Sequence, residues 1–239
     1  MNHEIIWQPS PNFRPGRSGW QPLVIVSHIT DGPYPGCLHW LTNPHRYPLS
    51  SAHYLINRAG RIYQLVRDED TAWGNGVVNR PSSALVLNHP GVNPNLYSLS
   101  IEHEGTPWEP LTEAQTLATI WLHEQLCTRW EIPRSRNYLL GHHEIDSVNR
   151  ANCPGAHFPW TRLLQELAAS ESGSLDWASY LYQGLPVRIR LDGELLPLDG
   201  RLIGDRTFVP LRALAEQLKL EVSWNEAERI VDLQQPPSA

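Results

Sequence analysis

The sequence predicts an α/β protein with a central mixed β-sheet flanked by helices, followed by a small α+β domain. Two short apolar runs, Leu23–Val26 and Tyr138–Leu140, have the length and composition of buried central strands. Between them, Thr112-Glu113-Ala114-Gln115 is a capping box that starts a helix. At 239 residues, the chain is long enough for one large domain, or for a large and a small one.

The composition narrows the range of partners and compartments. The formal net charge is −6 with no basic stripe, so nucleic acid is not an expected partner. Three cysteines (Cys37, Cys127 and Cys153) are an odd number at no framework spacing, which argues against a disulfide scaffold. The run Leu23–Val26 is too short for a membrane span, and the first residues lack the basic region of a signal peptide. We therefore expect synthesis in the cytoplasm and no membrane span.

Before the capping box, the pattern predicts an arm, a strand, a hairpin and two loops. Residues 1–22 are rich in Pro, Asn and Arg and form the irregular arm. Residues 51–65 alternate between apolar and polar side chains around a turn at Arg58-Ala59-Gly60, which is typical of a β-hairpin. A glycine-rich loop follows at 71–76, and a long surface loop at 77–98.

A further strand is predicted at 99–103, and its period of 2 divides the side chains between two faces. One face carries Leu99, Ile101 and His103, and the other carries Ser100, Glu102 and Glu104. Apolar residues at helical spacing then continue from the capping box towards Pro133. Another helix is predicted over Trp160–Leu167, with Pro159 in its first turn.

The chain changes character near residue 168, where Ala-Ala-Ser-Glu-Ser-Gly-Ser is typical of a linker. We therefore divide it into a first domain at 1–168, a linker at 169–185 and a small domain at 186–239. In the small domain we expect short strands, one helix and two turns: strands at 187–191, 194–198, 207–209, 221–224 and 230–233, the helix at 211–218, and turns at Asp192-Gly193 and Asp199-Gly200. A module of this size is marginally stable on its own.

Histidine and cysteine side chains gather at the ends of predicted strands. His28 follows the first strand, and His142, His143 and Cys153 follow the strand at 138–140. Imidazole and thiolate are ligands that Zn²⁺ prefers, and a catalytic zinc site takes three protein ligands plus a water. His28 and Cys153 with either His142 or His143 would complete such a site, although each residue alone is equally explained as a buried structural group. The sequence thus predicts a zinc site at strand ends.

Five short motifs follow one another along the first domain: Val26-Ser27-His28-Ile29-Thr30, Ser51-Ala52-His53-Tyr54-Leu55-Ile56, Ala72-Trp73-Gly74, Ser98-Leu99-Ser100-Ile101-Glu102 and Gly141-His142-His143-Glu144-Ile145. In kind and order they resemble type 2 N-acetylmuramoyl-L-alanine amidases, a family that includes phage lysozyme-type endolysins and peptidoglycan recognition proteins. The resemblance covers roughly residues 20–168.

The resemblance implies roles for four residues. His28, His142 and Cys153 would be the zinc ligands, since the family's histidine is the one directly after glycine. Glu102 matches the glutamate that many members place near the metal-held water, where a carboxylate can accept a proton. Glu104 shares its face and is the alternative base. The family zinc would also polarise the amide carbonyl.

The resemblance also has gaps. Some phage members have a tyrosine before the hairpin histidine and a lysine two residues before the metal-binding cysteine, where this chain has Ala52 and Ala151. Arg150 is adjacent and is our candidate for the missing positive charge, although arginine and lysine differ in reach. His53 and Trp73 are our candidates for substrate binding, with packing inside the protein as the alternative for each.

The tail carries a second resemblance. Thr207–Ala215, Val222–Trp224 and Ile230–Leu233 look like the small domain named after the copper amine oxidase N-terminus. The tail contains neither histidine nor cysteine, so no copper site is expected. Wall binding or protein contact is the expected role, and a stabilising appendage is the alternative.

Together, the resemblances imply a zinc-dependent peptidoglycan hydrolase that cleaves the amide between N-acetylmuramic acid and the L-alanine of the stem peptide. We expect a bacteriolytic, phage-type endolysin that acts on the cell wall after its release, because the tail would serve as an anchor. The alternatives are a cytoplasmic amidase that recycles wall fragments, and a non-catalytic peptidoglycan-binding protein. Cys153 argues against the last, since such proteins usually lack a ligand. A closed structural zinc site would need a fourth protein ligand.

Overall fold

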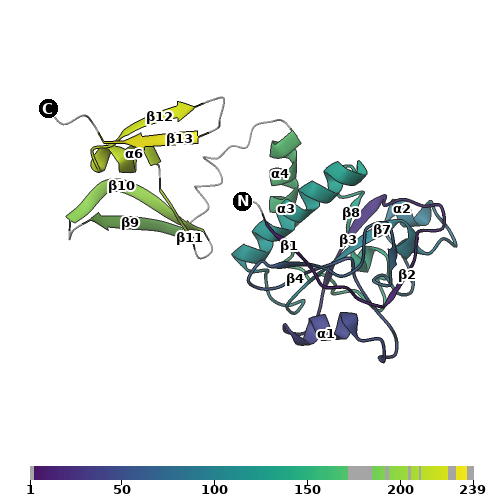
Figure 1. The fold of residues 1–239 in the computed structure, drawn as a ribbon. Helices are drawn as coiled ribbons and strands as arrows, with labels where there is room; N and C mark the ends of the chain where they lie inside the picture. The colour runs from purple at the N-terminus through teal and green to yellow at the C-terminus, as the bar shows by residue number, and fades with distance from the viewer. Residues whose placement is uncertain are drawn as a thin grey trace. The chain divides into compact units, whose positions relative to one another are not determined.

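The computed structural model describes residues 3–171, 185–191, 194–203, 206–209, 211–225 and 230–235. The chain divides into two compact units, Met1–Leu175 and Asp176–Ala239. As predicted, the N-terminal unit contains a central mixed sheet flanked by helices (Figure 1), and the C-terminal unit is a small β-rich domain with one described helix. Across these ranges, no helix combines the length and apolarity needed to cross a bilayer.

The N-terminal unit is built on a six-stranded sheet with strand order β1-β5-β4-β7-β3-β8. Its strands are β1 Ile5–Trp7, β3 Val24–Ile29, β4 Tyr54–Ile56, β5 Ile62–Gln64, β7 Ser98–His103 and β8 Leu139–Gly141. The predicted β4–β5 hairpin is antiparallel, whereas the other neighbouring pairs are parallel. Because β3, β7 and β8 run the same way, their carboxyl ends share one edge of the sheet, where open α/β sheets usually bind ligands.

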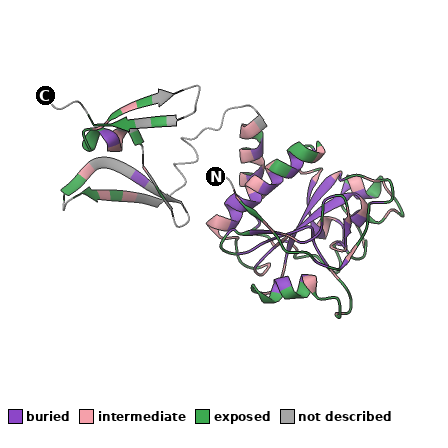
Figure 2. Cartoon of the chain, in the orientation of Figure 1, coloured by how far each residue is buried: buried purple, intermediate pink, exposed green. Residues whose placement is uncertain are grey.

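Helices cover both faces of this sheet. Its helices are α1 Gly36–Thr42, α2 Ala84–Leu87, α3 Glu113–Trp130 and α4 Trp160–Glu171, with short 3₁₀ turns η1 Pro94–Leu96 and η2 His142–Glu144. Tyr54 and Ile56 of β4 belong to the core cluster that contains residues of α3 and α4. Leu55, between them, packs in the cluster of α1. Since alternate residues of a strand point to opposite faces, α1 lies on the face opposite α3 and α4, and Figure 2 shows the buried sheet between them.

The capping box at the start of α3 forms as predicted. The Thr112 hydroxyl accepts a hydrogen bond from the Gln115 backbone N–H, and the Gln115 side chain accepts one from the Thr112 N–H. These two bonds satisfy donors that the first turn of a helix leaves free. The helix ends at Glu131, whose left-handed φ of 55° breaks the ladder two residues before Pro133.

Two predictions for the loops are wrong in part, and one helix was missed. The arm at 1–22 contributes β1 and also β2 Phe13–Arg14, which pairs with β6 Thr71–Ala72. The surface loop at 77–98 contains α2 and η1 and buries Val86 and Asn95. Helix α1 was not expected at all. These elements are only two to seven residues long, too short for a periodicity to mark them. Pairing with distant strands orders β1 and β2, and packing in the core orders α1 and α2.

The C-terminal unit contains β9 Leu185–Leu191, β10 Glu194–Ile203, β11 Arg206–Phe208, α6 Leu211–Gln217, β12 Glu221–Asn225 and β13 Ile230–Gln234. Strands β9, β10 and β11 form one antiparallel sheet, and β12 pairs with β13. The turn predicted at Asp199-Gly200 is wrong, since both residues lie within β10 after a shift of register. Asp192-Gly193 and residues 172–184 lie outside the described residues. The predicted domain and linker boundaries remain predictions, and α4 continues to Glu171, past residue 168.

Candidate active site

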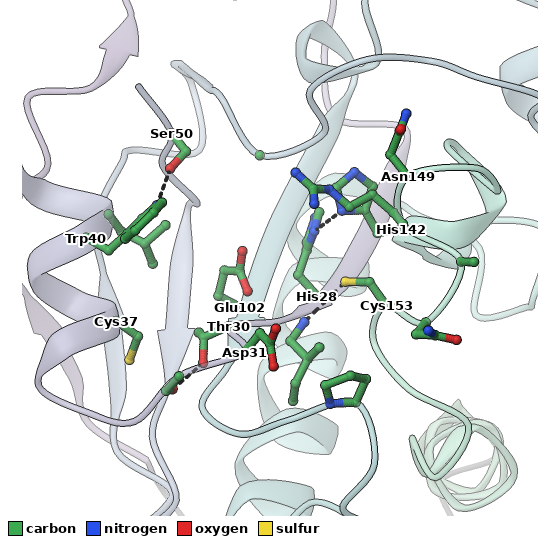
Figure 3. A pocket seen from close by; sticks show the side chains of 18 of the residues that line it. His28, Thr30, Asp31, Cys37, Trp40, Ser50, Glu102, His142, Asn149 and Cys153 are labelled. Atoms are coloured by element: carbon green, nitrogen blue, oxygen red, sulfur yellow. Dashed lines mark hydrogen bonds between the residues drawn. The ribbon is translucent and has the colours of Figure 1, made fainter. Parts of the chain in front are cut away.

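The three predicted ligands come together at the carboxyl edge of the sheet. His28 lies near the end of β3, His142 follows β8 directly, and Cys153 lies in the turn beyond. One ligand atom from each lies within 4.8 Å of the others. His28 Nδ1 is 2.9 Å from His142 Nδ1, and the Cys153 sulfur accepts the Ile29 N–H at 3.4 Å (Figure 3). Parallel pairing of β3 with β8 produces this convergence from residues more than a hundred positions apart.

The hydrogen bonds of the cluster suit a cation. His142 Nε2 is 3.0 Å from the Asn75 carbonyl oxygen, which can only accept, so Nε2 carries the proton and Nδ1 keeps its lone pair. His28 Nε2 is buried without a partner. His143 instead lies with Nδ1 2.9 Å from the Cys153 carbonyl, so the structure brings His142 and not His143 into the cluster. Two nitrogens and a sulfur match the donor set of a catalytic zinc site with one open position.

Burial keeps all three side chains uncharged in the absence of a cation. Burial, with smaller effects of nearby groups, lowers the pKa of His28 well below its ordinary value and that of His142 to about 4. Burial also raises the pKa of the Cys153 thiol to about 12. A metal ion needs neutral imidazoles, which are already present, and a thiolate, so binding would release a proton from Cys153.

Two carboxylates, Glu102 in β7 and Glu104 just after its end, have different surroundings. Glu102 pairs with His28 across the sheet, lines the cleft, and has a buried Oε2 without a hydrogen-bond partner. Burial raises the pKa of Glu102 to about 7, and the charge of Arg150 opposes this rise. Glu104 is fully engaged, because its two oxygens accept the backbone N–H groups of Tyr34 and Arg58. Glu102 is therefore the carboxylate available for chemistry.

A cleft of about 710 Å³ opens over these groups. Arg150 and Ala151 line it on the turn that leads to Cys153. The buried Asp146 side chain holds this turn by accepting the backbone N–H groups of Val148 and Asn149, and its carbonyl accepts the Arg150 N–H. The turn thus presents the Arg150 side chain at the cleft, next to Ala151.

The structure does not place the two predicted substrate contacts in the cleft. His53 is completely buried, and its Nδ1 accepts the Ser100 N–H while Nε2 lies 3.2 Å from the Asp70 carbonyl. Trp73 is not among the residues that line the cleft. His53 follows the alternative of packing inside the protein, whereas Trp73 is half-buried and its role in substrate binding remains a prediction.

Two other tryptophans line the cleft and were missed. Trp40 of α1 is 43% exposed and donates its indole N–H to the Ser50 hydroxyl, and Trp108 is 69% exposed. Both follow segments rich in glycine and proline, which was the available signal for surface loops. The aromatic side chains that line the cleft therefore come from residues outside the five motifs.

Comparison with known proteins agrees with this geometry. Residues 18–156 match the N-acetylmuramoyl-L-alanine amidase family, and residues 191–236 match the copper amine oxidase N-terminal domain. The chain is 34% identical over 118 residues to the 1,6-anhydro-N-acetylmuramyl-L-alanine amidase AmpD of Haemophilus influenzae, covering 49% of this chain and 58% of that protein. It is 29% identical over 170 residues to AmpD of Citrobacter freundii, covering 64% and 85%.

Solved structures show the same fold. A selenomethionine derivative of AmpD superposes with a TM-score of 0.57 at 26% identity, over 70% of this chain and 96% of that one. The amidase LysC from Clostridium intestinale matches with a TM-score of 0.51 at 20% identity, over 72% and 99%. The latter likeness is one of fold alone. Since the family match covers more than half of the chain, the protein belongs to the N-acetylmuramoyl-L-alanine amidase family.

Proposed function

We propose that this protein is a zinc-dependent amidase that cleaves the bond between N-acetylmuramic acid and L-alanine, with soluble wall fragments as its substrate. The observation that carries the proposal is the convergence of His28, His142 and Cys153 next to the unpaired oxygen of Glu102. Three donors with one open position favour a catalytic metal over a closed structural one. The complete donor set also argues against a purely binding protein.

In this proposal the three converging side chains hold the metal. A zinc ion bound there would polarise the amide carbonyl and lower the pKa of a water to about 7. Glu102 Oε2 accepts a proton from the attacking water and returns it to the nitrogen of the departing L-alanine, so that amide and water become acid and amine. Arg150 stabilises the negative charge that develops on the carbonyl oxygen.

The relatives favour wall fragments over intact wall as the substrate. The curated AmpD proteins, at 29–34% identity, are named for 1,6-anhydro-N-acetylmuramyl-L-alanine, a small soluble compound. The endolysin-type amidases match only in fold, at 20% identity. The comparisons therefore support the recycling alternative better than the endolysin that we first expected. The C-terminal unit remains the one feature that favours action on intact wall.

The test is to present both substrates to one preparation. Zinc-loaded protein is incubated with an anhydromuramyl tripeptide and, separately, with purified wall sacculi, and new L-alanine amino termini are quantified by mass spectrometry. We expect rapid release from the soluble compound and little from sacculi. Release mainly from sacculi would restore the endolysin hypothesis, and release from neither would refute the proposed activity.

A further inference from the structure

The glycine-rich loop at 71–76 contacts one of the proposed metal ligands through its backbone. Within it, the carbonyl oxygen of Asn75 accepts the hydrogen bond from His142 Nε2 at 3.0 Å. This single contact decides which nitrogen of His142 carries the proton and aims the other at His28, 2.9 Å away. Partners of this kind orient metal-binding histidines and make them more basic. The orientation of His142 therefore depends on how firmly the Asn75 peptide is held.

Two side chains outside the loop hold Asn75 in place. Its backbone N–H donates to Asn95 Oδ1 at 2.9 Å, and its side-chain amide donates to the Ser98 hydroxyl at 2.6 Å. All three residues are at most 5% exposed, so these bonds are made away from solvent. In such an environment a lost partner leaves a buried donor unsatisfied, which costs more than the bond itself contributes.

The loop reaches this position because Gly74 lacks a side chain. A Cβ at Gly74 would lie 2.5 Å from the Ser100 hydroxyl and 3.3 Å from the Ser51 carbonyl oxygen. The backbone therefore runs flush against β7, and Gly74 lines the cleft. Because the loop is pressed against the sheet at Gly74 and tied to η1 at Asn75, the carbonyl of Asn75 has little freedom to turn.

We propose that Asn95 is a positioning residue for the metal centre, acting through the backbone of Asn75 on the His142 ring. The proposal rests on the metal site of the proposed function. Asn95 touches neither substrate nor metal. Its side-chain oxygen anchors the N–H of Asn75. The carbonyl of the same residue, in the next peptide unit, fixes the proton on His142 Nε2 and leaves Nδ1 free to bind a cation.

The experiment measures metal affinity, so that it does not depend on turnover. Zinc and cobalt affinities of the full chain are determined by competition with a chelator, and the cobalt absorption spectrum reports ligand geometry. Asn95→Ala should weaken binding about 10-fold. This is the lower end of the roughly 10- to 100-fold range for direct partners of a metal-bound histidine, because Asn95 acts one hydrogen bond further out. Asn95→Asp keeps an acceptor oxygen and should bind within a few-fold of wild type.

A matched control lies in the same turn. Asn93 caps η1 by accepting the Asn95 N–H at 3.0 Å, so Asn93→Ala disturbs η1 without removing the acceptor for Asn75. It should lower thermal stability and leave zinc affinity near wild type. Should Asn95→Ala fail to fold, Ser98→Ala takes its place and is expected to weaken zinc binding.

The outcomes separate this inference from the proposed function. If wild type binds no zinc, the proposed function itself fails. If wild type binds zinc and folded Asn95→Ala binds it equally well, the positioning role is refuted while the metal site stands. Equal weakening by Asn93→Ala and Asn95→Ala would also refute it, because the integrity of η1 alone would then explain the effect.

Discussion

Two groups of buried histidines lie a few ångströms apart in this protein, and they differ in one property. His28 and His142 at the cleft, and His103 of β7 with His123 of helix α3, all have pKa values lowered by burial. In the second group every ring nitrogen has an oxygen partner. His103 bonds to the His28 carbonyl and the Thr119 hydroxyl, and His123 to the Thr119 carbonyl and the Ser27 hydroxyl.

The ring nitrogens of His28 and His142 do not all have an oxygen partner. The two Nδ1 atoms face each other at 2.9 Å, and His28 Nε2 has no partner. Burial and a lowered pKa are therefore common to the fully hydrogen-bonded histidines and to the two proposed metal ligands, and ring nitrogens without an oxygen partner are what distinguish the latter. Glu102 and Glu104 differ in the same way, since only Glu102 has a buried side-chain oxygen without a hydrogen-bond partner.

The largest effect that would test this distinction comes from the thiol of the cluster. Cys153→Ser should reduce zinc affinity by more than about 100-fold, beyond the loss expected for an outer partner, and abolish amidase activity. Metal content after dialysis and product release measure the two effects. Cys127→Ala, a buried thiol outside the cleft, is the control and should keep its zinc. Wild-type zinc content in Cys153→Ser would contradict the assigned ligand set.

Next in size is the loss of the unpaired carboxylate. Glu102→Gln should lower kcat about 10²- to 10⁴-fold, the usual contribution of a general base, with one zinc per chain retained. Glu104→Gln is the matched control. It should instead destabilise the fold by about 1–3 kcal/mol, because one of the two backbone N–H groups it accepts would face an amide donor. Reversed results for the two variants would exchange their roles.

The pH dependence gives a smaller and sharper effect. Glu102 must be ionised to accept a proton. Burial raises its pKa to about 7 in the metal-free site, and a bound zinc ion would lower it, so kcat should increase with pH along an acidic limb at or below about 7. The charge of Arg150 lowers this pKa, so Arg150→Ala should move the acidic limb of the pH profile to higher pH. Arg150→Lys should move the limb part of the way back towards its wild-type position. A profile unchanged in Arg150→Ala would remove Arg150 from the electrostatics of the site.

His123, whose two ring nitrogens both have oxygen partners, should make the stability of the fold depend on pH. Burial lowers the pKa of His123 to about 4, below the roughly 6.5 of an unfolded histidine. The unfolded chain therefore binds more protons below about pH 6.5, and the free energy of unfolding falls as pH falls from there towards 4. His123→Gln should reduce this slope by up to about one proton in chelator-treated protein. A slope equal to that of the wild-type protein would contradict the assignment.

The smallest expected effect concerns the wall of the cleft. Trp108 is the most exposed tryptophan among the residues that line it. Trp108→Ala should raise KM several-fold at nearly unchanged kcat, since it removes binding surface remote from the reacting atoms. Trp7→Ala, on the edge strand β1, should change neither constant. A kcat effect as large as that of Glu102→Gln would mean that Trp108 takes part in the chemistry.

The features predicted well from sequence are those encoded locally. The capping box at Thr112, the hairpin at 51–65 and the apolar runs that became β3 and β8 each depend on neighbouring residues, and the structure contains them all. The cluster of His28, His142 and Cys153 was inferred from strand ends and ordered motifs, and the parallel pairing of β3 with β8 brings the three together.

The features missed depend on distant partners. His53 was expected at the substrate, and contact with Arg17, 36 residues earlier, together with Ser100 accounts for its burial. Glu102 and Glu104 are equivalent by strand period, and only the backbone of Tyr34 and Arg58 tells them apart. No local pattern records such contacts.

The central distinction is between histidines whose ring nitrogens all have oxygen partners and the two cleft histidines, which have ring nitrogens without them. Its most direct test is a zinc titration of chelator-treated wild-type protein. Amidase activity on an anhydromuramyl peptide is followed as the metal is added. The structure predicts no activity without metal, a linear rise that stops at one zinc per chain, and cleavage that leaves L-alanine at the new amino terminus. Full activity in metal-free protein, or saturation with zinc and no new L-alanine terminus, would contradict it.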